Sequence, residues 1–485
     1  MMPLHMPTAT IDIHTILPEI ILLAGAFIAL LVDAFTFMQG KRFSHGISLC
    51  VLGIAAIACL QGFNTQSHVS DYLLIRDLFS NITSLVIIAI AFITISYGWS
   101  YWCEPKLQHG EIPVLILFAT AGMLFLVSAG HFIMLYIGLE LLALCSYALV
   151  GSARDCPESS EAAMKYVLLG SLSSGLLLYG ISLVYGATGS LSLYGDDPFV
   201  LVHLTNSVMA LTGTIFIIAG IAFKLGAAPF HMWLPDVYQG APTPVALFVS
   251  SAPKLAAFGM AYRILNPVTV PYFGYLSAIF AVLSAISLVL GNCTALLQTY
   301  YKRLLGFSTV SHIGFVLMGV ACGTIAGWSA ALFYTIAYAI MSTASFGVLM
   351  ALRRNGVEFT SIDDFKGLAQ RSPWMAASLS CILFSLAGIP PFLGFWAKFA
   401  VVKAAFSCNL WWIAVLGLLC AVIGAGYYLR LVQFMYFFPI NNSSELDVGS
   451  DRTQLTWVAG AHAIFLLVLG FTCNSLLLHC VMAFL

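Results

Sequence analysis

The chain consists almost entirely of apolar stretches that are long enough to cross a lipid bilayer. A hydrocarbon core of about 30 Å needs roughly 20 apolar residues per helix. By that measure the 485 residues predict fourteen transmembrane helices. The expected spans are residues 15–37, 45–63, 77–101, 112–127, 131–151, 162–186, 205–228, 242–264, 272–297, 303–322, 326–351, 373–406, 408–437 and 454–483. Only 8% of the residues are charged, against about 25% in soluble domains, so the sequence predicts an all-α integral membrane protein.

The basic residues of the loops predict the orientation of the chain. If the N-terminus lies outside, the outer loops hold only Arg76 and Arg263, whereas the inner loops hold eleven of the nineteen Lys and Arg residues. These eleven are Lys41, Arg42, Lys106, Arg154, Lys302, Arg303, Arg353, Arg354, Lys366, Arg371 and Arg452. Because Lys and Arg accumulate in inner loops, both termini are expected on the outer side. The first fourteen residues hold no Lys or Arg, so the first apolar run is expected to be an uncleaved helix.

Two segments interrupt the helical pattern with a glycine that is followed by Pro-Phe. One runs from Lys224 to Asp236, and the other runs from Leu386 to Lys398. Proline removes a backbone donor and clashes with the preceding turn, so each helix is expected to break. Within a membrane, non-helical backbone is tolerated only where it is buried in protein or lines a wet cavity. A matched pair of broken helices is typical of transporters with internal repeats, and the alternative is two unrelated proline kinks.

The breaks suggest two repeats of five helices each. Residues 112–264 would form the first repeat and residues 272–437 the second, with the broken helix fourth in both. An odd number of helices per repeat makes the two copies inverted in the membrane. Residues 1–111 would supply three N-terminal helices, and residues 438–485 a polar loop and the last helix.

A few charged side chains are expected deep in the membrane. Glu140, Lys224, Lys254 and Lys398 lie near the middle of predicted spans, and Lys165 lies about one turn into its helix. Each central charge costs at least about 2.5–3.5 kcal/mol, so four together cost on the order of 10 kcal/mol. Burial also favours the uncharged form of such groups, so that they can exchange protons near neutral pH. We therefore expect a proton relay. A structural ion pair, the alternative, would leave two lysines without partners.

Two histidines are weaker candidates for the same relay. His231 follows the first break, and His312 lies near the start of a predicted helix. Imidazole changes its charge near neutral pH and so suits a proton station. For either residue, a hydrogen-bonded histidine at a helix end is an equally simple interpretation.

Cofactor sites are not expected on this chain. The twelve cysteines contain no CxxC pair and lie singly in apolar stretches, which argues against zinc or iron–sulfur ligation and against a disulfide framework. The sequence has no glycine-rich phosphate loop after a strand, and its net charge of −1 gives no reason to expect nucleic acid. Any redox cofactor is expected on another subunit, and no metal site is expected here.

A resemblance to a known family rests on the segments around the two breaks. The run from His231 to Val245 and the Ser-Ala-Pro-Lys254 that follows resemble the antiporter-like membrane subunits of respiratory complex I, the proton-translocating NADH–quinone oxidoreductase. The resemblance continues through residues 302–312 and 385–398 and covers nearly the whole chain. The Pro-Asp-Val-Tyr-Gln-Gly-Ala-Pro run is specific to one subunit of this group.

The resemblance implies a role for each residue that matches the family pattern. Glu140 would pair with Lys224, and Lys165 would modulate that pair. Lys254 would be the central relay and Lys398 the terminal one. A charge change in a neighbouring subunit, driven by quinone reduction elsewhere, would weaken the Glu140–Lys224 attraction and push a proton onward.

The resemblance also implies the surroundings of the chain. Its partners would be the lipid bilayer and other membrane subunits of complex I, including sister antiporter-like subunits. NADH, FMN, iron–sulfur clusters and quinone would be bound by other subunits. The chain would lie in a bacterial inner membrane with both termini in the periplasm.

Two other functions stay open at this point. An Mrp-type cation/proton antiporter subunit shares the fold, but several carboxylates around a cation site would favour it and the sequence has one deep Glu. A membrane scaffold without transport would not need the deep lysines.

Overall fold

A computed structural model describes most of the chain. It covers residues 13–35, 40–63, 67–69, 72–102, 111–194, 208–354, 357–439 and 453–484. The α-helices are α1 (Ile13–Phe35), α2 (Gly40–Gln61), α3 (Leu78–Trp102), α4 (Glu111–Ser128), α5 (Phe132–Val150), α6 (Pro157–Thr188), α7 (Val208–Leu225), α8 (Trp233–Gly240), α9 (Thr243–Leu296), α10 (Tyr301–Ala321), α11 (Ile325–Ala351), α12 (Leu368–Arg371), α13 (Pro373–Ala387), α14 (Leu393–Ser407), α15 (Trp411–Phe437), α16 (Thr453–Phe471) and α17 (Cys473–Met482). The predicted all-α architecture is confirmed, and most helices begin and end within a few residues of the expected spans.

Twelve helical segments of the described chain are long and apolar enough to cross a membrane, or thirteen if α16 and α17 count as one bent span. These two helices meet at an angle of 72°, where a single last helix was expected. The expected span 373–406 is divided into α13 and α14, each too short to cross alone. The spans expected at 242–264 and 272–297 belong to one helical element, α9.

A few short elements that the sequence analysis did not anticipate join the helices. β1 (Ser67–Val69) pairs with β2 (Leu74–Arg76), and β3 (Arg353–Arg354) pairs with β4 (Val357–Glu358), both antiparallel. The 3-10 helix η2 (Ile362–Phe365) follows β4. These elements lie in the connections and leave the membrane part helical.

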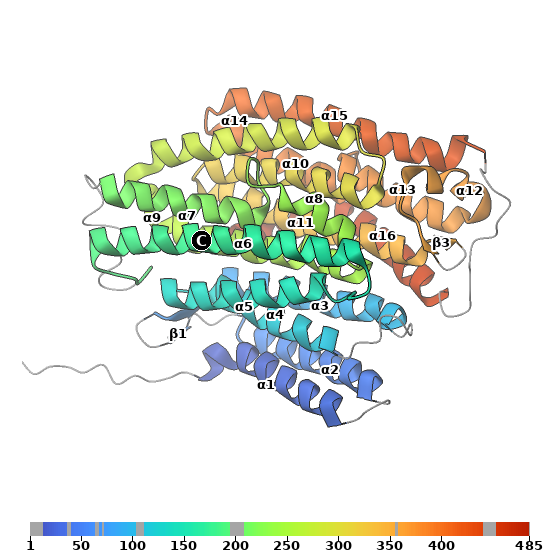
Figure 1. The fold of residues 1–485 in the computed structure, drawn as a ribbon. Coiled ribbons are helices and arrows are strands. Elements are labelled where there is room, and N and C mark those ends of the chain that lie inside the picture. The colour runs from blue at the N-terminus through green and yellow to red at the C-terminus, as the bar shows by residue number, and fades with distance from the viewer. Residues whose placement is uncertain are drawn as a thin grey trace, which may run out of the picture.

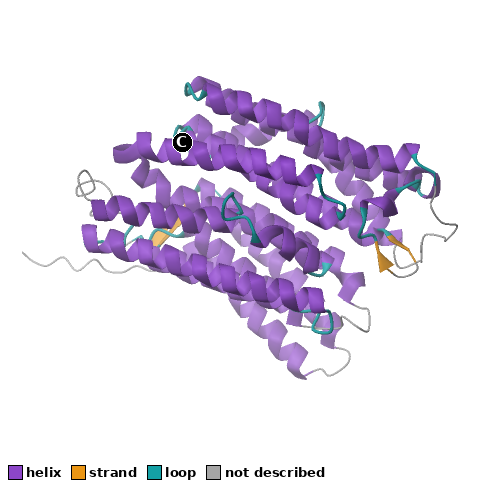
Figure 2. Ribbon diagram, turned by 45° about the horizontal axis from the view of Figure 1, so that its top comes forward, coloured by secondary structure: helices purple, strands orange, loops and turns teal. Residues whose placement is uncertain are grey.

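The helices lie side by side and roughly parallel, so that the molecule has two ends (Figures 1 and 2). β1, the beginning of α1 and the C-terminus lie toward one end, and β3 lies at the other (Figure 1). α1 and α2 form one edge of the bundle, and α15 lies at the opposite edge. Lys106 and Arg452, two of the basic residues expected in inner loops, lie outside the described residues.

The ends of several helices are fixed by local signals in the sequence. Pro157 occupies the first turn of α6, where its missing N–H costs nothing, and Gly189 ends the helix in the left-handed conformation at φ 75°. The His131 side chain accepts a hydrogen bond from the backbone N–H of Ile133 at 3.1 Å and caps α5.

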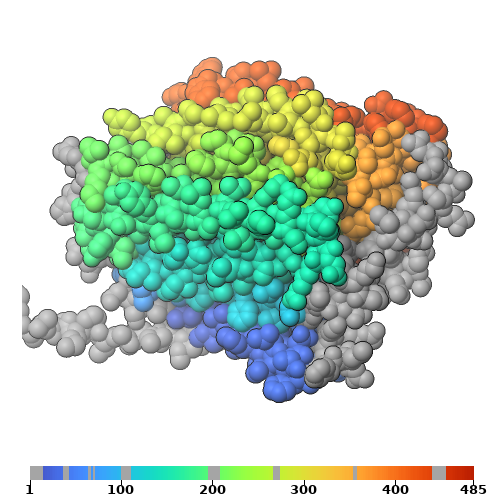
Figure 3. All heavy atoms as spheres, viewed as in Figure 1, coloured from blue at the N-terminus to red at the C-terminus, as the bar shows by residue number. Residues whose placement is uncertain are grey.

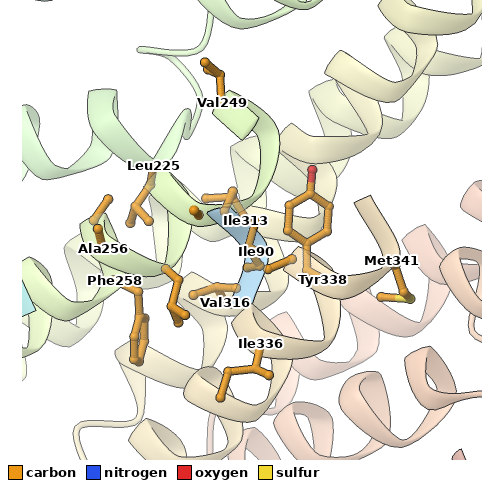
Figure 4. Close-up of a cluster of buried hydrophobic side chains, with 14 of the residues drawn as sticks. Ile90, Leu225, Val249, Ala256, Phe258, Ile313, Val316, Ile336, Tyr338 and Met341 are labelled. Carbon is orange, nitrogen blue, oxygen red and sulfur yellow. The ribbon is translucent and has the colours of Figure 1, made fainter. Parts of the chain in front are cut away.

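The centre of the molecule is an apolar core formed mainly by α9, α10 and α11. Phe258 of α9, Val316 of α10 and Ile336 of α11 meet there and are at most 1% exposed (Figure 4). The outer surface is apolar as well. α6 crosses the face seen in Figure 3 and exposes large side chains such as Leu168 and Leu172. Exposed apolar area of this extent fits a surface that faces lipid or other membrane subunits.

Two ion pairs fix the N-terminal part of the chain: the first joins α1 to β2 and is buried, and the second joins the start of α3 to α9 and is partly buried. The Arg76 Nη2 donates to both oxygens of Glu19 at 2.9 and 3.1 Å, and both side chains are at most 3% exposed. Arg263 binds the Asp77 carboxylate with two hydrogen bonds of 2.8 Å. Burial acts to raise the pKa of Asp77, but the Arg263 guanidinium outweighs it and holds that pKa below its usual value. Arg263, expected in an outer loop, instead lies within α9 and is 1% exposed.

Candidate functional site

The first predicted break is present between α7 and α8. α7 ends at Leu225, α8 begins at Trp233, and the chain between them is not α-helical. Gly226 follows the end of α7 with φ 83°, a left-handed conformation that costs other residues about 1–2 kcal/mol. The last carbonyls of α7 therefore lie inside the protein without helical partners.

Lys254, which comes from α9, binds these unpaired carbonyls. Its side chain is fully buried, and its Nζ donates to the carbonyl oxygens of Leu225 at 2.9 Å and Lys224 at 3.3 Å. The same Nζ lies 4.5 Å from the centroid of the Trp233 ring. The C-terminal end of a helix carries partial negative charge, so the end of α7 and the aromatic face together stabilise an ammonium group in an apolar region.

The second predicted break has the same construction. α13 ends at Ala387, Gly388 follows with φ 81°, and α14 begins at Leu393. The Lys398 Nζ donates to the carbonyl oxygens of Leu386 at 3.1 Å and Ala387 at 2.8 Å. In both breaks a lysine thus binds the last two carbonyls before a left-handed glycine.

This geometry makes Lys254 the counterpart of Lys398. Lys224 precedes its Pro-Phe pair, whereas Lys398 follows its own, so these two lysines need not occupy equivalent places. The side chain that caps the first break comes from a different helix. Gly226 and Gly388 allow the lysine side chains to approach the backbone closely, because a Cβ on either glycine would lie 3.2 Å from the nearby lysine Nζ.

Lys224 and Lys254 line the same small cavity. It has a volume of about 20 Å³ and is also lined by Tyr166 and Trp233. A polar cavity of about this size is large enough to hold one water molecule. Two basic side chains at one cavity repel each other when both are charged, which favours leaving one of them neutral.

Glu140 lies near Lys224 but does not contact it directly. Neither oxygen of Glu140 comes within 4.0 Å of the Lys224 Nζ, although the carboxylate acts on that lysine electrostatically. The Glu140 Oε1 is buried and has no hydrogen-bond partner among the described residues. Glu140 is partly exposed and shares the outward side of α5 with Ile137 and Leu144, which are 49% and 62% exposed.

Lys165 lies in a charged cluster at the surface. It forms ion pairs with Glu161 at 2.7 Å and Asp236 at 3.0 Å, and its side chain is 44% exposed. Arg303 binds the other oxygen of Asp236 at 2.7 Å. The cluster lines an open cleft of about 1330 Å³ beside α8. Among the predicted site residues, Lys165 is therefore accessible, whereas Lys254 is enclosed.

The two candidate histidines have different surroundings. His231 lies in the first break, with its ring 6.3 Å from that of Phe307. His312 is 3% exposed, and its two ring nitrogens contact the hydroxyls of Tyr334 at 2.7 Å and Tyr428 at 3.2 Å. The residues with which His312 and Lys254 interact, namely Tyr334, Tyr428 and Trp233, were not among the predicted site residues. Their only signal in the sequence is a polar aromatic residue within an apolar span.

No group of three or more His, Cys, Asp or Glu side chains is placed to hold a metal ion in the part of the chain that the structure describes. The candidate groups are lysine, histidine and tyrosine side chains near the two helix breaks, together with Glu140 on α5. Groups of these types can bind and release protons.

The sequence is similar to one family of membrane proteins and to relatives that share one name. Residues 129–424 match the family described as NADH:quinone oxidoreductase/Mrp antiporter, TM. The chain is 52% identical over 483 residues to NADH-quinone oxidoreductase subunit N of Xanthomonas euvesicatoria pv. vesicatoria, covering 99% of this chain and 98% of the relative. It is 42% identical to the protein of the same name from Laribacter hongkongensis, with the same coverage.

Solved structures show the same fold. A chain of respiratory complex I from Thermus thermophilus with bound aureothin superposes with a TM-score of 0.80 at 29% identity, covering 95% of this chain and 98% of that one. A chain of the Mrp complex from Dietzia sp. DQ12-45-1b superposes with a TM-score of 0.84 at 21% identity, covering 96% and 97%. The second similarity concerns the fold alone.

Proposed function

We propose that this chain, which belongs to the NADH:quinone oxidoreductase/Mrp antiporter family of membrane proteins, is the proton-translocating membrane subunit N of an NADH–quinone oxidoreductase. Relatives of that name align along nearly its entire length. The observation that carries the chemistry is the pair of helix breaks, in each of which a lysine binds the last two carbonyls before the glycine. Lys254 is fully buried and Lys398 is partly exposed. Ammonium groups are costly within an apolar membrane protein, and reversible proton binding is a function that explains why they are kept.

The proposed path begins at Glu140 and Lys224. The Glu140 carboxylate stabilises the charged form of Lys224 through space. If this attraction weakens, Lys224 releases its proton through the shared cavity to Lys254. From there the proton moves by way of His312 to Lys398, the lysine of the second break.

Lys165 and His231 have supporting parts in this proposal. Lys165, bound to Asp236 in the open cleft beside α8, would adjust the charge around the first break. His231 lies in the break itself and would bind and release protons there.

The position of Glu140 supports coupling to a neighbouring membrane subunit. A carboxylate at the outward side of a membrane helix, between the exposed Ile137 and Leu144, is unfavourable against lipid. A neighbouring subunit that covers this side of α5 would remove the cost and could change the charge next to Glu140. The energy would come from quinone reduction elsewhere, and NADH, FMN, iron–sulfur clusters and quinone would be bound by other subunits.

The Mrp-type antiporter function and the scaffold function are less well supported. The resemblance to the Mrp complex is confined to the fold, whereas the relatives at 42–52% identity are named as oxidoreductase subunits. Glu19 is buried in the described helices, but Arg76 binds its carboxylate, so Glu19 does not supply a cation site.

Replacement of Glu140 tests this function. Glu140→Gln keeps the shape and removes the charge, so the attraction that loads Lys224 is lost, and NADH–quinone turnover should fall several-fold or more. Glu140→Asp should retain part of the activity. Turnover is measured per assembled complex, isolated through a tag on this chain together with its partner subunits. Full turnover of the Gln variant in an intact complex would show that Glu140 is not part of the proton path.

We also propose that the chain lies in a bacterial inner membrane with both termini in the periplasm. The eleven-to-two distribution of basic residues between the two sides supports this orientation, and the two on the outer side, Arg76 and Arg263, are paired with the carboxylates of Glu19 and Asp77. A reporter enzyme that is active only in the cytoplasm should therefore be inactive when fused after Leu485. An active fusion would contradict the orientation.

A further inference from the structure

His312 is held between two tyrosines that come from different helices. Its Nδ1 contacts the hydroxyl of Tyr334 on α11 at 2.7 Å, and its Nε2 contacts the hydroxyl of Tyr428 on α15 at 3.2 Å. The histidine is 3% exposed and both tyrosines are 1% exposed. Both ring nitrogens are thus engaged by groups that can donate or accept a proton.

The three side chains lie beside the second break. The Lys398 Nζ is 5.6 Å from the centroid of the Phe315 ring, and that ring stacks on Tyr334 with centroids 5.6 Å apart. Lys398 also acts electrostatically on His312. The tyrosine–histidine group is therefore close to the lysine that would receive its proton.

A further pair of buried hydroxyls lies beside His312. Tyr338 is on α11 and is 3% exposed. The Tyr338 hydroxyl is hydrogen-bonded to Thr309 at 2.7 Å, one helical turn before His312, and the Tyr338 and His312 rings are 5.0 Å apart. In Figure 4 the Tyr338 hydroxyl points away from the apolar side chains around it.

The two ring nitrogens of a neutral imidazole differ, and this difference sets the direction of the hydrogen bonds in the group. A neutral histidine has one N–H donor and one bare nitrogen. With a tyrosine hydroxyl at each nitrogen, one tyrosine donates to the ring while the other accepts from it. The three residues then form an oriented chain of hydrogen bonds.

We propose that Tyr428, His312 and Tyr334 form one proton-transfer unit that delivers protons to Lys398; this inference rests on the proposed function. A proton binds the Tyr428 oxygen, and the original Tyr428 O–H bond breaks as its proton forms an N–H bond at Nε2. The N–H bond at Nδ1 breaks, and that proton binds the Tyr334 oxygen. Tyr334 releases its former hydroxyl proton to the neutral amine of Lys398, directly or through water.

This step leaves no charge on the unit but reverses its orientation. One proton enters at Tyr428 and one leaves at Tyr334, while the proton of the ring moves from Nδ1 to Nε2. Both hydroxyls and the ring must be reset before a second proton can follow in the same direction. The unit therefore transfers one proton each time it is reset and does not conduct protons continuously.

A structural role is the competing explanation. The two hydrogen bonds join α10 to α11 and α15, and each would stabilise the packing by about 1 kcal/mol. Removal of one hydroxyl would then lower stability slightly and leave proton transfer unchanged. The two explanations make different predictions for turnover in D2O: only a role in proton transfer predicts that the variants become more sensitive to the solvent isotope.

The test uses Tyr334→Phe and Tyr428→Phe in the whole complex, reconstituted in liposomes. Each change deletes one oxygen, so we expect the complex to assemble but proton pumping to fall at least about tenfold. The ratio of turnover in H2O to that in D2O should rise, because proton transfer becomes rate-limiting. Tyr97→Phe is the matched control, since the Tyr97 hydroxyl is buried without a hydrogen-bond partner among the described residues and should be dispensable.

A second measurement does not depend on deletion of the hydroxyl. 3,5-Difluorotyrosine at position 428 keeps the shape but has a more acidic hydroxyl, and it should shift the pH profile of turnover to lower pH. Normal pumping and an unchanged isotope ratio in both Phe variants would overturn the inference. If Lys254→Arg is inactive in the same assay, the proposed function survives that failure; if Lys254→Arg is active as well, both are wrong.

Discussion

Complexes that carry Lys254→Arg should assemble but lose NADH–quinone turnover by at least about tenfold. Arginine keeps the positive charge and N–H donors for the carbonyls of Lys224 and Leu225, to which the Lys254 Nζ donates. A guanidinium cannot be deprotonated in this setting, so a proton station is lost while a charged cap is kept. Turnover is measured in membranes and normalised to the amount of assembled complex.

The structure makes this variant a sharper test than Lys254→Met. Methionine fits the apolar surroundings, but it leaves two buried carbonyls without a donor, which costs about 1–3 kcal/mol each. Lys403→Arg on α14 is the matched control, because Lys403 is exposed and should tolerate the change. Wild-type turnover of Lys254→Arg would show that Lys254 stabilises the break without transferring protons.

Gly388→Ala should cause the second large loss. The new Cβ would lie 2.8 Å from the Lys398 Cδ and 3.2 Å from its Nζ, and φ 81° adds about 1–2 kcal/mol of backbone strain. Lys398 must then leave the carbonyls of Leu386 and Ala387, so we expect turnover per assembled complex to fall about tenfold or more.

Gly189→Ala is the control that distinguishes the effect of displacing Lys398 from the effect of backbone strain. Gly189 has a similar φ of 75°, but nothing lies within 4 Å of a Cβ added there. This variant should lose some stability and keep its activity. Equal loss of activity in both variants, or full activity of Gly388→Ala, would contradict the assigned role of the Lys398 contact.

The helices could be predicted from the sequence because each is a nearly uninterrupted apolar run. α4 and α5 begin and end within one residue of the expected spans. α6 begins five residues earlier than expected, because Pro157 starts the helix within a polar stretch. The continuity of α9 and the bend between α16 and α17 depend on packing, which the local pattern does not report.

The candidate site was predictable only in part. The central positions of Glu140, Lys224, Lys254 and Lys398 in membrane spans can be predicted from the sequence, because a charge within an apolar run is rare. The contacts of each side chain cannot be predicted in this way, because the partners come from distant parts of the chain. The Lys254 Nζ reaches a carbonyl 29 residues earlier, and His312 contacts a tyrosine 116 residues later.

The number of protons pumped per NADH oxidised tests the central claim most directly. It is measured in liposomes that contain the wild-type complex or the Lys254→Arg complex, with proton uptake and NADH oxidation recorded on the same sample. If protons pass through the lysines at the two breaks, the variant pumps fewer protons per NADH at its residual turnover, or stops altogether. A wild-type ratio at wild-type turnover would show that protons do not pass through Lys254.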